Sequence, residues 1–352
     1  MKIGASALLL VATTLVGCAP SSRGTSDLIG SETKTLDAGG VGTKGPGCTG
    51  APDCGGCADC ASMCWCLTQN GGACLQRCQS LAPPPPPPPI PTEPVTLQMA
   101  AFDVAPGAEA FMCQSFTNPF QQDVAILTSE SFMTEGSHHF FAFHLQGVTD
   151  MPLAACGGLD FHPYIHSAQV PHLKTTYPAG VGRFLPGKDG VEILSHYLNT
   201  TSDMIHADVR LVLTVVDPST VPIQASDVFM NNLSLSIPPM ARTTASKSCA
   251  VGSDIKLLQA ASHMHQRGVH FTAKTDDGTV LYQTDSWSEP TPKLFDPPLS
   301  IPGGTNITWS CDYDNPTNTT FTFGQSAVTN EMCIFTGIYF PAPDGAGIEC
   351  LF

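Results

Sequence analysis

Seven consecutive prolines, Pro83 to Pro89, constrain the fold of this chain more than any other feature of its sequence. Each proline ring fixes the backbone angle φ at about −65° and removes a backbone donor, which excludes a helix and a paired strand from the run. A run of this kind adopts the extended polyproline II conformation. We therefore predict a stiff linker over residues 81–94 that holds two unlike parts of the chain apart.

The part after the linker consists of short apolar segments separated by turn signals. Residues 208–216 form one β-rich segment, and Asp277-Gly278 separates two more, which predicts a β-hairpin. No stretch has the pattern of an amphipathic helix of three turns. We predict an all-β fold with two tandem antiparallel β-sandwich domains, jelly-roll-like, over residues 95–222 and 223–352.

The part before the linker begins as an export signal. Met1-Lys2 precedes an apolar stretch that is too short to span a membrane as a helix. Leu15-Val16-Gly17-Cys18 matches the bacterial lipobox, so we predict a lipoprotein signal peptide over residues 1–18 and a lipid on Cys18. Ala19 favours an outer-membrane location, on the periplasmic face or the cell surface. The alternative is an ordinary secretory signal.

The cysteines divide the chain further. Residues 19–47 are rich in Gly, Ser and Thr and predict a flexible tether. Residues 48–80 hold eight of the 15 cysteines and are too short to build an apolar core, so we predict a small disulfide-rich module. Zinc held by some of these thiolates is the alternative. Six more cysteines lie in the sandwich region, and Cys18 accounts for the odd one.

The charge balance excludes one class of partner. Acidic residues outnumber basic ones by 30 to 15, and no run of Lys or Arg occurs. A surface that binds phosphates needs such a run, so we exclude nucleic acid and expect membrane contact only through the lipid anchor. The sequence predicts no oligomeric state.

Histidines are grouped in a way that suggests a metal site. Residues i and i+2 of a strand share a face, so His263 and His265 can meet at one metal while Met264 points away. A buried core pair is an equally good interpretation of this spacing. His138 and His139 are adjacent, so they need a bulge or a strand end to share a site. The remaining isolated histidines are interpreted as surface or satisfied core residues: His162, His166, His172 and His206.

Four segments resemble the copper type II, ascorbate-dependent monooxygenases, the family of peptidylglycine α-hydroxylating monooxygenase and dopamine β-monooxygenase. Ser137-His-His-Phe140 resembles the His-His-Met segment of that family, and Ile193-Leu-Ser-His-Tyr197 resembles its strand that ends in His-Tyr. Ala261-Ser-His-Met-His-Gln-Arg-Gly268 is similar to its His-x-His…Gly segment, and Asn330–Pro341 to its Glu-Met-Cys…Tyr-Pro segment. All four occur in the order of the family.

The resemblance implies two copper ions. His138, His139 and His196 match the three-histidine copper of the first domain, and His263, His265 and Met332 match the oxygen-binding copper of the second. It further implies that ascorbate or a similar reductant supplies electrons and that O₂ hydroxylates an activated C–H bond. The second electron would then come from the three-histidine copper across an open cleft. A thioether favours Cu(I), which fits Met332 in the oxygen-binding role.

The family pattern also implies three disulfides, Cys113–Cys156, Cys249–Cys350 and Cys311–Cys333, the last tying the strand of Met332 to its neighbour. One departure concerns the substrate. The peptide-hydroxylating members hold the substrate carboxylate with an Arg and a Tyr, and this chain has Ala261 and Thr336 at those positions. A glycine-extended peptide is therefore not expected as the substrate.

These features predict a copper monooxygenase of the cell envelope that acts on an unidentified small or peptide-like organic compound. The alternative is a non-catalytic envelope protein that binds copper or transfers electrons. A third reading is a structural or adhesive surface module, which would leave the ordered ligand positions without an explanation.

Overall fold

The structure is a computed structural model that describes residues 87–158 and 162–352. The predicted signal peptide, Cys18, the tether, the cysteine-rich module and the start of the linker lie outside the described residues. Among the described residues, no helix is of a length and apolarity that would allow it to cross a membrane.

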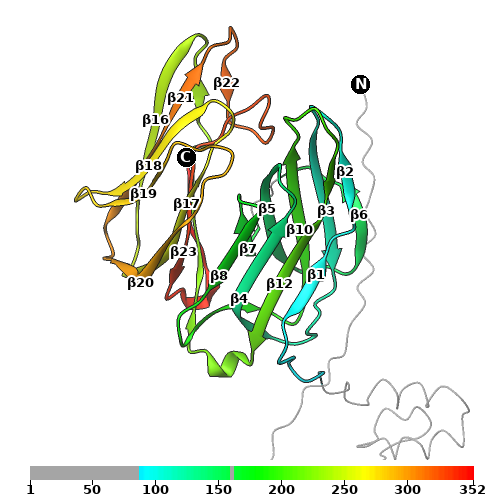
Figure 1. Cartoon of the computed structure of the whole chain (residues 1–352). Coiled ribbons are helices and arrows are strands. Elements are labelled where there is room, and N and C mark those ends of the chain that lie inside the picture. Colours follow the sequence, from blue (N-terminus) through cyan, green and yellow to red (C-terminus); the bar gives the residue numbers. More distant parts are fainter. Residues whose placement is uncertain (1–86, 159–161) are drawn as a thin grey trace, which may run out of the picture. The chain divides into compact units, whose positions relative to one another are not determined.

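The described chain is all-β, as predicted, and forms two sandwiches (Figure 1). The first sandwich contains one sheet in the order β1-β12-β4-β9-β13, with β8 beside β4, and a second in the order β6-β3-β10-β5-β7. A short pair, β2 and β11, completes it. Its strands are β1 (Val95–Gln98), β2 (Phe102–Val104), β3 (Glu109–Phe116), β4 (Val124–Met133), β5 (Ser137–Gln146), β6 (Met151–Ala155), β7 (Tyr164–Ala168), β8 (His172–Thr176), β9 (Val181–Leu185), β10 (Asp189–Leu198), β11 (Ile205–Ala207), β12 (Val209–Val216) and β13 (Ile223–Gln224).

The second sandwich packs the sheet β20-β17-β23-β14-β24 on the sheet β16-β21-β18-β19, and β15 pairs with β22. Two 3₁₀ turns, Pro218–Thr220 and Pro343–Gly345, are the only helical elements among the described residues. The strands of this sandwich are β14 (Ser226–Asn231), β15 (Ser236–Ile237), β16 (Ala241–Ala250), β17 (Ile255–His263), β18 (Gly268–Thr275), β19 (Val280–Thr284), β20 (Lys293–Ile301), β21 (Asn306–Asn315), β22 (Phe321–Thr322), β23 (Ile334–Phe340) and β24 (Ile348–Leu351).

Alternating side chains build both cores. In β12 every second residue is buried, which is the pattern that predicted a strand here. The first core contains Phe140, Tyr197 and Leu211, and the second contains Trp309 and Phe271. The predicted hairpin is confirmed, because β18 pairs antiparallel with β19. Its turn includes Gly278 at φ 88°, a conformation that favours glycine.

The boundary between the sandwiches lies slightly later than predicted. β13 pairs in parallel with β9, with Ile223 opposite Val181, so the first sandwich extends through Gln224. The second begins with β14 at Ser226. A further parallel pair joins β14 to β24, so the sheets are antiparallel apart from these two short ladders.

Three disulfides join the pairs of cysteines that the family pattern implies. Cys113–Cys156 lies in the first sandwich, and Cys249–Cys350 and Cys311–Cys333 lie in the second, with Cα–Cα distances of 5.8, 6.4 and 5.8 Å. One expectation about them is wrong. Cys311 lies on β21 and Cys333 just before β23, so this bridge joins the two facing sheets rather than neighbouring strands of one sheet.

The two sandwiches contact each other through an apolar cluster and a buried ion pair. The cluster combines Phe143, Tyr164 and Leu194 of the first sandwich with Phe229, Met332 and Ile334 of the second. Beside it, the guanidinium of Arg183 on β9 binds the carboxylate of Asp227 on β14 through two hydrogen bonds. The candidate site lies along this interface.

Candidate metal centre

A β-bulge presents the first pair of histidines. His139 on β5 lies opposite His196 on β10, but the next residue of β10, Tyr197, pairs with Ser137. His138 is therefore the extra residue of a bulge, which turns its side chain toward the face occupied by His139. The sequence predicted that this pair requires a bulge or a strand end, and the structure has the bulge at the start of β5. Both side chains are 3% exposed.

The second pair lies at the end of β17. His263 is the last residue of this strand, and His265 follows the buried Met264, which belongs to the core of the second sandwich. The i, i+2 spacing predicted that Met264 points away from the two histidines, and the structure has this arrangement. Gly268 makes this turn possible, because a Cβ at its position would lie 2.8 Å from both Cβ and Sδ of Met264.

Five imidazoles from the two sandwiches come together. The possible ligand atoms of His138, His139 and His196 lie within 4.8 Å of one another, and so do those of His138, His263 and His265. His138 thus belongs to both triads, and its ring centroid lies 4.8 Å from that of His263. The ring of Trp287 packs against the same histidine at 5.8 Å.

The contact between the histidines of the two sandwiches corrects one expectation. The resemblance implied two metal sites on either side of an open cleft, whereas here the histidines of one sandwich pack against those of the other. The physical reason is the apolar cluster described above, which closes the interface beside the histidines.

Hydrogen bonds set the tautomers of three of the rings. A carboxylate only accepts, so His196 donates from Nε2 to Glu109 at 3.0 Å and leaves Nδ1 without a proton. The amide nitrogen of Gln169 donates to the carbonyl of Ser262, so its oxygen accepts from Nδ1 of His263 at 2.5 Å. His265 likewise donates from Nδ1 to the carbonyl of Asn330 at 3.1 Å.

The nitrogens that remain are buried and lack partners. They are Nε2 of His263, Nε2 of His265, both ring nitrogens of His138 and Nδ1 of His139. Buried polar atoms are nearly always satisfied in folded proteins, so five unpaired imidazole nitrogens in one place require an explanation. A metal ion bound by these atoms satisfies them, and neutral imidazole is a common metal ligand. The residues present therefore fit a metal.

Burial keeps these rings neutral. It lowers the pKa of His138, His139 and His263 well below the usual value, and neighbouring histidines lower each pKa further. Burial also lowers the pKa of His196, and it lowers that of His265 to about 4. Neutral rings have a free lone pair, so no proton needs to be displaced before a metal binds at neutral pH.

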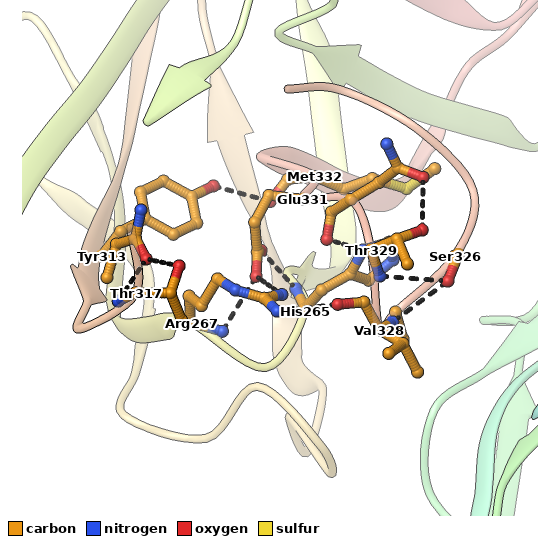
Figure 2. Close-up of polar contacts among 12 residues, drawn as sticks. His265, Arg267, Tyr313, Thr317, Ser326, Val328, Thr329, Glu331 and Met332 are labelled. Atoms are coloured by element: carbon orange, nitrogen blue, oxygen red, sulfur yellow. Dashed lines mark hydrogen bonds and ion pairs between the residues drawn. The ribbon is translucent and has the colours of Figure 1, made fainter. Parts of the chain in front are cut away.

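The loop 323–333 contacts His265 and the turn that follows β17 (Figure 2). The buried carboxylate of Glu331 accepts from the backbone amides of His265 and Arg267 at 3.1 and 2.9 Å. Burial raises the pKa of Glu331 to about 7, against the opposing effect of its bonds to Arg267. The guanidinium of Arg267 also donates to the carbonyl of Val328, so the loop and the turn after β17 are fixed together.

Met332 follows directly in this loop. It is 2% exposed, lies in the interface cluster with Phe229 and Ile334, and its carbonyl accepts from the hydroxyl of Tyr313 at 2.7 Å. The β17–β23 ladder ends at the pair of His263 and Ile334, so Met332 lies two residues beyond the end of the ladder. The third imidazole within reach of His263 and His265 in the structure is that of His138.

Histidines outside the cluster have other partners. His166 is buried between the hydroxyls of Ser129 and Ser131 at 2.8 and 2.9 Å, which confirms it as a satisfied core residue. Of the other five, four form pairs with acids and one is exposed: His144 pairs with Asp189, His172 with Glu130, His206 with Asp103 and His270 with Asp285, while His162 is exposed.

Two cavities lie at the interface between the sandwiches. The smaller, of about 30 Å³, is lined by His139 and His263 together with Ala261 and Thr336. The larger, of about 350 Å³, is lined by aromatic side chains, by Arg183 and by the acids Asp227, Asp344 and Glu349. It shares Phe141 and Phe229 with the smaller one. These two phenylalanine rings therefore separate the larger cavity from the histidine cluster.

Sequence reasoning missed the side chains that orient the histidines. Glu109 and Gln169 are separated by 87 and 94 residues from the histidines that they bind, and no local spacing indicates such contacts. Glu331 lies within the segment that carries the resemblance, but nothing in the sequence assigns it the backbone contacts described here.

No protein-family model matches this chain, and no curated protein matches it. Among solved structures, the STIV MCP is similar over 71% of this chain and 97% of its own length, with 8% identity and a TM-score of 0.33. The PBCV-1 virus capsid covers 70% of this chain and 93% of its own, with 8% identity and a TM-score of 0.26. The major capsid protein P2 from bacteriophage PM2 covers 72% and 100%, with 7% identity and a TM-score of 0.28. Likenesses this weak carry no conclusion about this chain.

Proposed function

We propose that this chain is a copper-dependent monooxygenase that hydroxylates an organic compound with O₂ and ascorbate or a similar reductant. The observation that carries the proposal is the group of five neutral, buried imidazoles, four of which have ring nitrogens without protein partners. The ligand order along the chain and its resemblance to the copper type II monooxygenases favour copper over other metals. Copper, when bound, supplies one-electron transfer and the activation of O₂.

Each protein group has a defined task in this proposal. His263 and His265 would hold one ion through Nε2, and the thioether of Met332 would favour its reduced form. His138, His139 and His196 would hold the other. Because Gln169 and Asn330 keep the Nδ1 protons on His263 and His265, these rings present their lone pairs in a fixed direction.

We place the organic substrate in the larger cavity. Its volume of about 350 Å³ is that of a small-molecule site, and its wall contains Phe141, Phe143 and Tyr164. Arg183 is the one cationic side chain that lines it, and its guanidinium is bound to Asp227. The lining also includes the carboxylates of Asp344 and Glu349, so the cavity favours an aromatic compound without a carboxylate. Since Phe141 and Phe229 separate it from the histidines, oxidation requires these rings or the sandwiches to move.

The test measures metal and turnover on the full chain. We expect two copper ions per chain by elemental analysis and ascorbate-dependent O₂ uptake with a member of a panel of apolar compounds. Met332→Ile should leave the three-histidine site loaded and abolish O₂ uptake coupled to hydroxylation. His166→Gln is the matched control, since it changes a buried histidine outside the cluster and should leave copper content and turnover unchanged.

Other results would redirect the assignment. Two bound copper ions with no oxygen uptake from any compound of the panel would favour a copper-binding or electron-transfer protein instead. Full turnover in Met332→Ile would show that the oxygen site is elsewhere.

A further inference from the structure

Two side chains contact a histidine of the cluster and the opposite sandwich at the same time. Glu109 on β3 binds His196 of its own sandwich, and it accepts from the hydroxyl of Ser326 and the amide of Ala327 in the second, both at 2.6 Å. Gln169, just after β7, binds His263 and the carbonyl of Ser262, which both belong to the second sandwich.

These contacts are matched to the chemistry of their partners. All three groups that meet the Glu109 carboxylate are donors: Nε2 of His196, the hydroxyl of Ser326 and the amide of Ala327. Gln169 uses both ends of its amide, donating to a carbonyl and accepting from a ring nitrogen. Each side chain therefore has its complete set of partners only when the two sandwiches are closed on each other.

The contacts also decide which nitrogen each histidine offers. With Glu109 in place, His196 carries its proton on Nε2 and turns Nδ1 toward His139, whose Nε2 lies 3.0 Å away. With Gln169 in place, His263 carries its proton on Nδ1 and leaves Nε2 free. If the sandwiches separate, Gln169 leaves His263, and Glu109 loses the two donors that fix its orientation.

We propose that Glu109 and Gln169 are positioning residues that couple the closure of the two sandwiches to the orientation and tautomer of the metal-binding histidines. Closure completes the binding site, and a bound metal stabilises closure, as linkage between two equilibria requires. The inference rests on the proposed function only in taking His196 and His263 as metal ligands.

The experiment compares four variants of the full chain. Glu109→Leu and Gln169→Leu remove the contacts. Glu109→Gln is the conservative rescue, because its oxygen can still accept from His196 and Ala327 while its amide group donates to Ser326. Thr175→Val is the matched control, since Thr175 forms a hydrogen bond to Gln259 of the other sandwich at 3.4 Å and that pair involves no histidine.

The first measurement is made on the chain without bound metal. Long-range ¹H–¹⁵N NMR spectra of the histidine rings should show the proton of His196 on Nε2 and that of His263 on Nδ1 in the wild type and in Thr175→Val. In each leucine variant the histidine that lost its partner should become a mixture of tautomers. Small-angle X-ray scattering should give both leucine variants a larger radius of gyration than the wild type.

The second readout is Cu(I) affinity, measured by competition with a chromophoric chelator. We expect a loss of about 10–100-fold in each leucine variant, and about twofold or less in Glu109→Gln and Thr175→Val. Unchanged tautomers and an affinity loss no greater than that of Thr175→Val would overturn the inference. A wild-type chain that binds no copper would defeat the proposed function, while the NMR and scattering results would still decide the role of the two residues.

Discussion

Ala261 on β17 and Thr336 on β23 lie directly opposite each other in the antiparallel ladder between the two strands. Opposite residues share one face of the sheet, and both side chains line the small cavity beside His139 and His263. By the resemblance, these match the two positions at which the peptide-hydroxylating monooxygenases hold a carboxylate, and here the pair provides no charge.

The missing charge predicts how ligands are selected. An acylglycine and its primary amide differ only in the carboxylate, and we expect the acid to bind no more tightly than the amide. The physical reason is that a buried carboxylate without a cationic partner loses its hydration. Titration calorimetry on the copper-loaded chain measures both affinities. Tenfold tighter binding of the acid would show that a cation reaches the cavity after all.

Gly268 should tolerate no side chain. Because an added Cβ would meet Met264 at 2.8 Å, Gly268→Ala should shift the residue between the two histidines and destabilise the fold by about 1–3 kcal/mol. Urea denaturation measures the free energy of unfolding. Gly252→Ala is the control, since nothing lies within 4 Å of its added Cβ, and its effect should stay below about 1 kcal/mol. Equal effects at the two positions would argue against the close contact.

The ion pair between Arg183 and Asp227 should be costly to break. The two side chains are only 5% and 9% exposed, so Asp227→Asn leaves a buried guanidinium without its counter-charge and should cost about 3–5 kcal/mol. Asp314→Asn breaks a surface pair in which Arg242 is 85% exposed, and should cost at most about 1 kcal/mol. Replacing both Arg183 and Asp227 with apolar residues should recover most of the loss. Urea unfolding at neutral pH distinguishes these outcomes.

His166 should make the fold sensitive to acid. Burial lowers its pKa from 6.5 to about 3, so between these values the unfolded chain binds a proton that the folded chain does not. Stability is therefore lost as the pH falls through this window, by about 3 kcal/mol at about pH 4.5 from this group alone.

The variant His166→Gln tests this contribution. Because its side chain does not titrate, the difference in unfolding free energy between pH 7 and pH 4.5 should be smaller in the variant than in the wild type by about 3 kcal/mol. The other buried histidines contribute equally to both proteins and cancel. An identical pH dependence of the unfolding free energy in the two proteins would mean that folding does not lower the pKa of His166.

Much of the fold could be predicted from local patterns. The alternation in β12 and the Asp277-Gly278 turn indicate strands and a hairpin, because the period of two and the need for a positive φ are visible in adjacent residues. The requirement for a bulge at His138 could be deduced in the same way, since two adjacent residues of a regular strand face opposite sides.

The closed interface and its orienting residues could not be predicted in this way. Glu109 and Gln169 meet their histidines only after the two sandwiches have folded and packed, and the packing depends on an apolar cluster drawn from several distant strands. The parallel pairing of β13 with β9, which moved the boundary between the sandwiches, is likewise set by contacts across 42 positions or more of chain rather than by local residue preference.

The placement of the disulfides has a mechanical consequence. None of the three disulfides in the described part of the chain joins one sandwich to the other. Disulfide formation therefore stabilises each sandwich separately. The interface between the sandwiches is held by packing, hydrogen bonds and one ion pair, and the chain crosses from one sandwich to the other once, near Ala225. Such an interface opens without breaking a covalent bond. A compound can therefore enter and leave it under the same oxidising conditions that keep the disulfides of each sandwich intact.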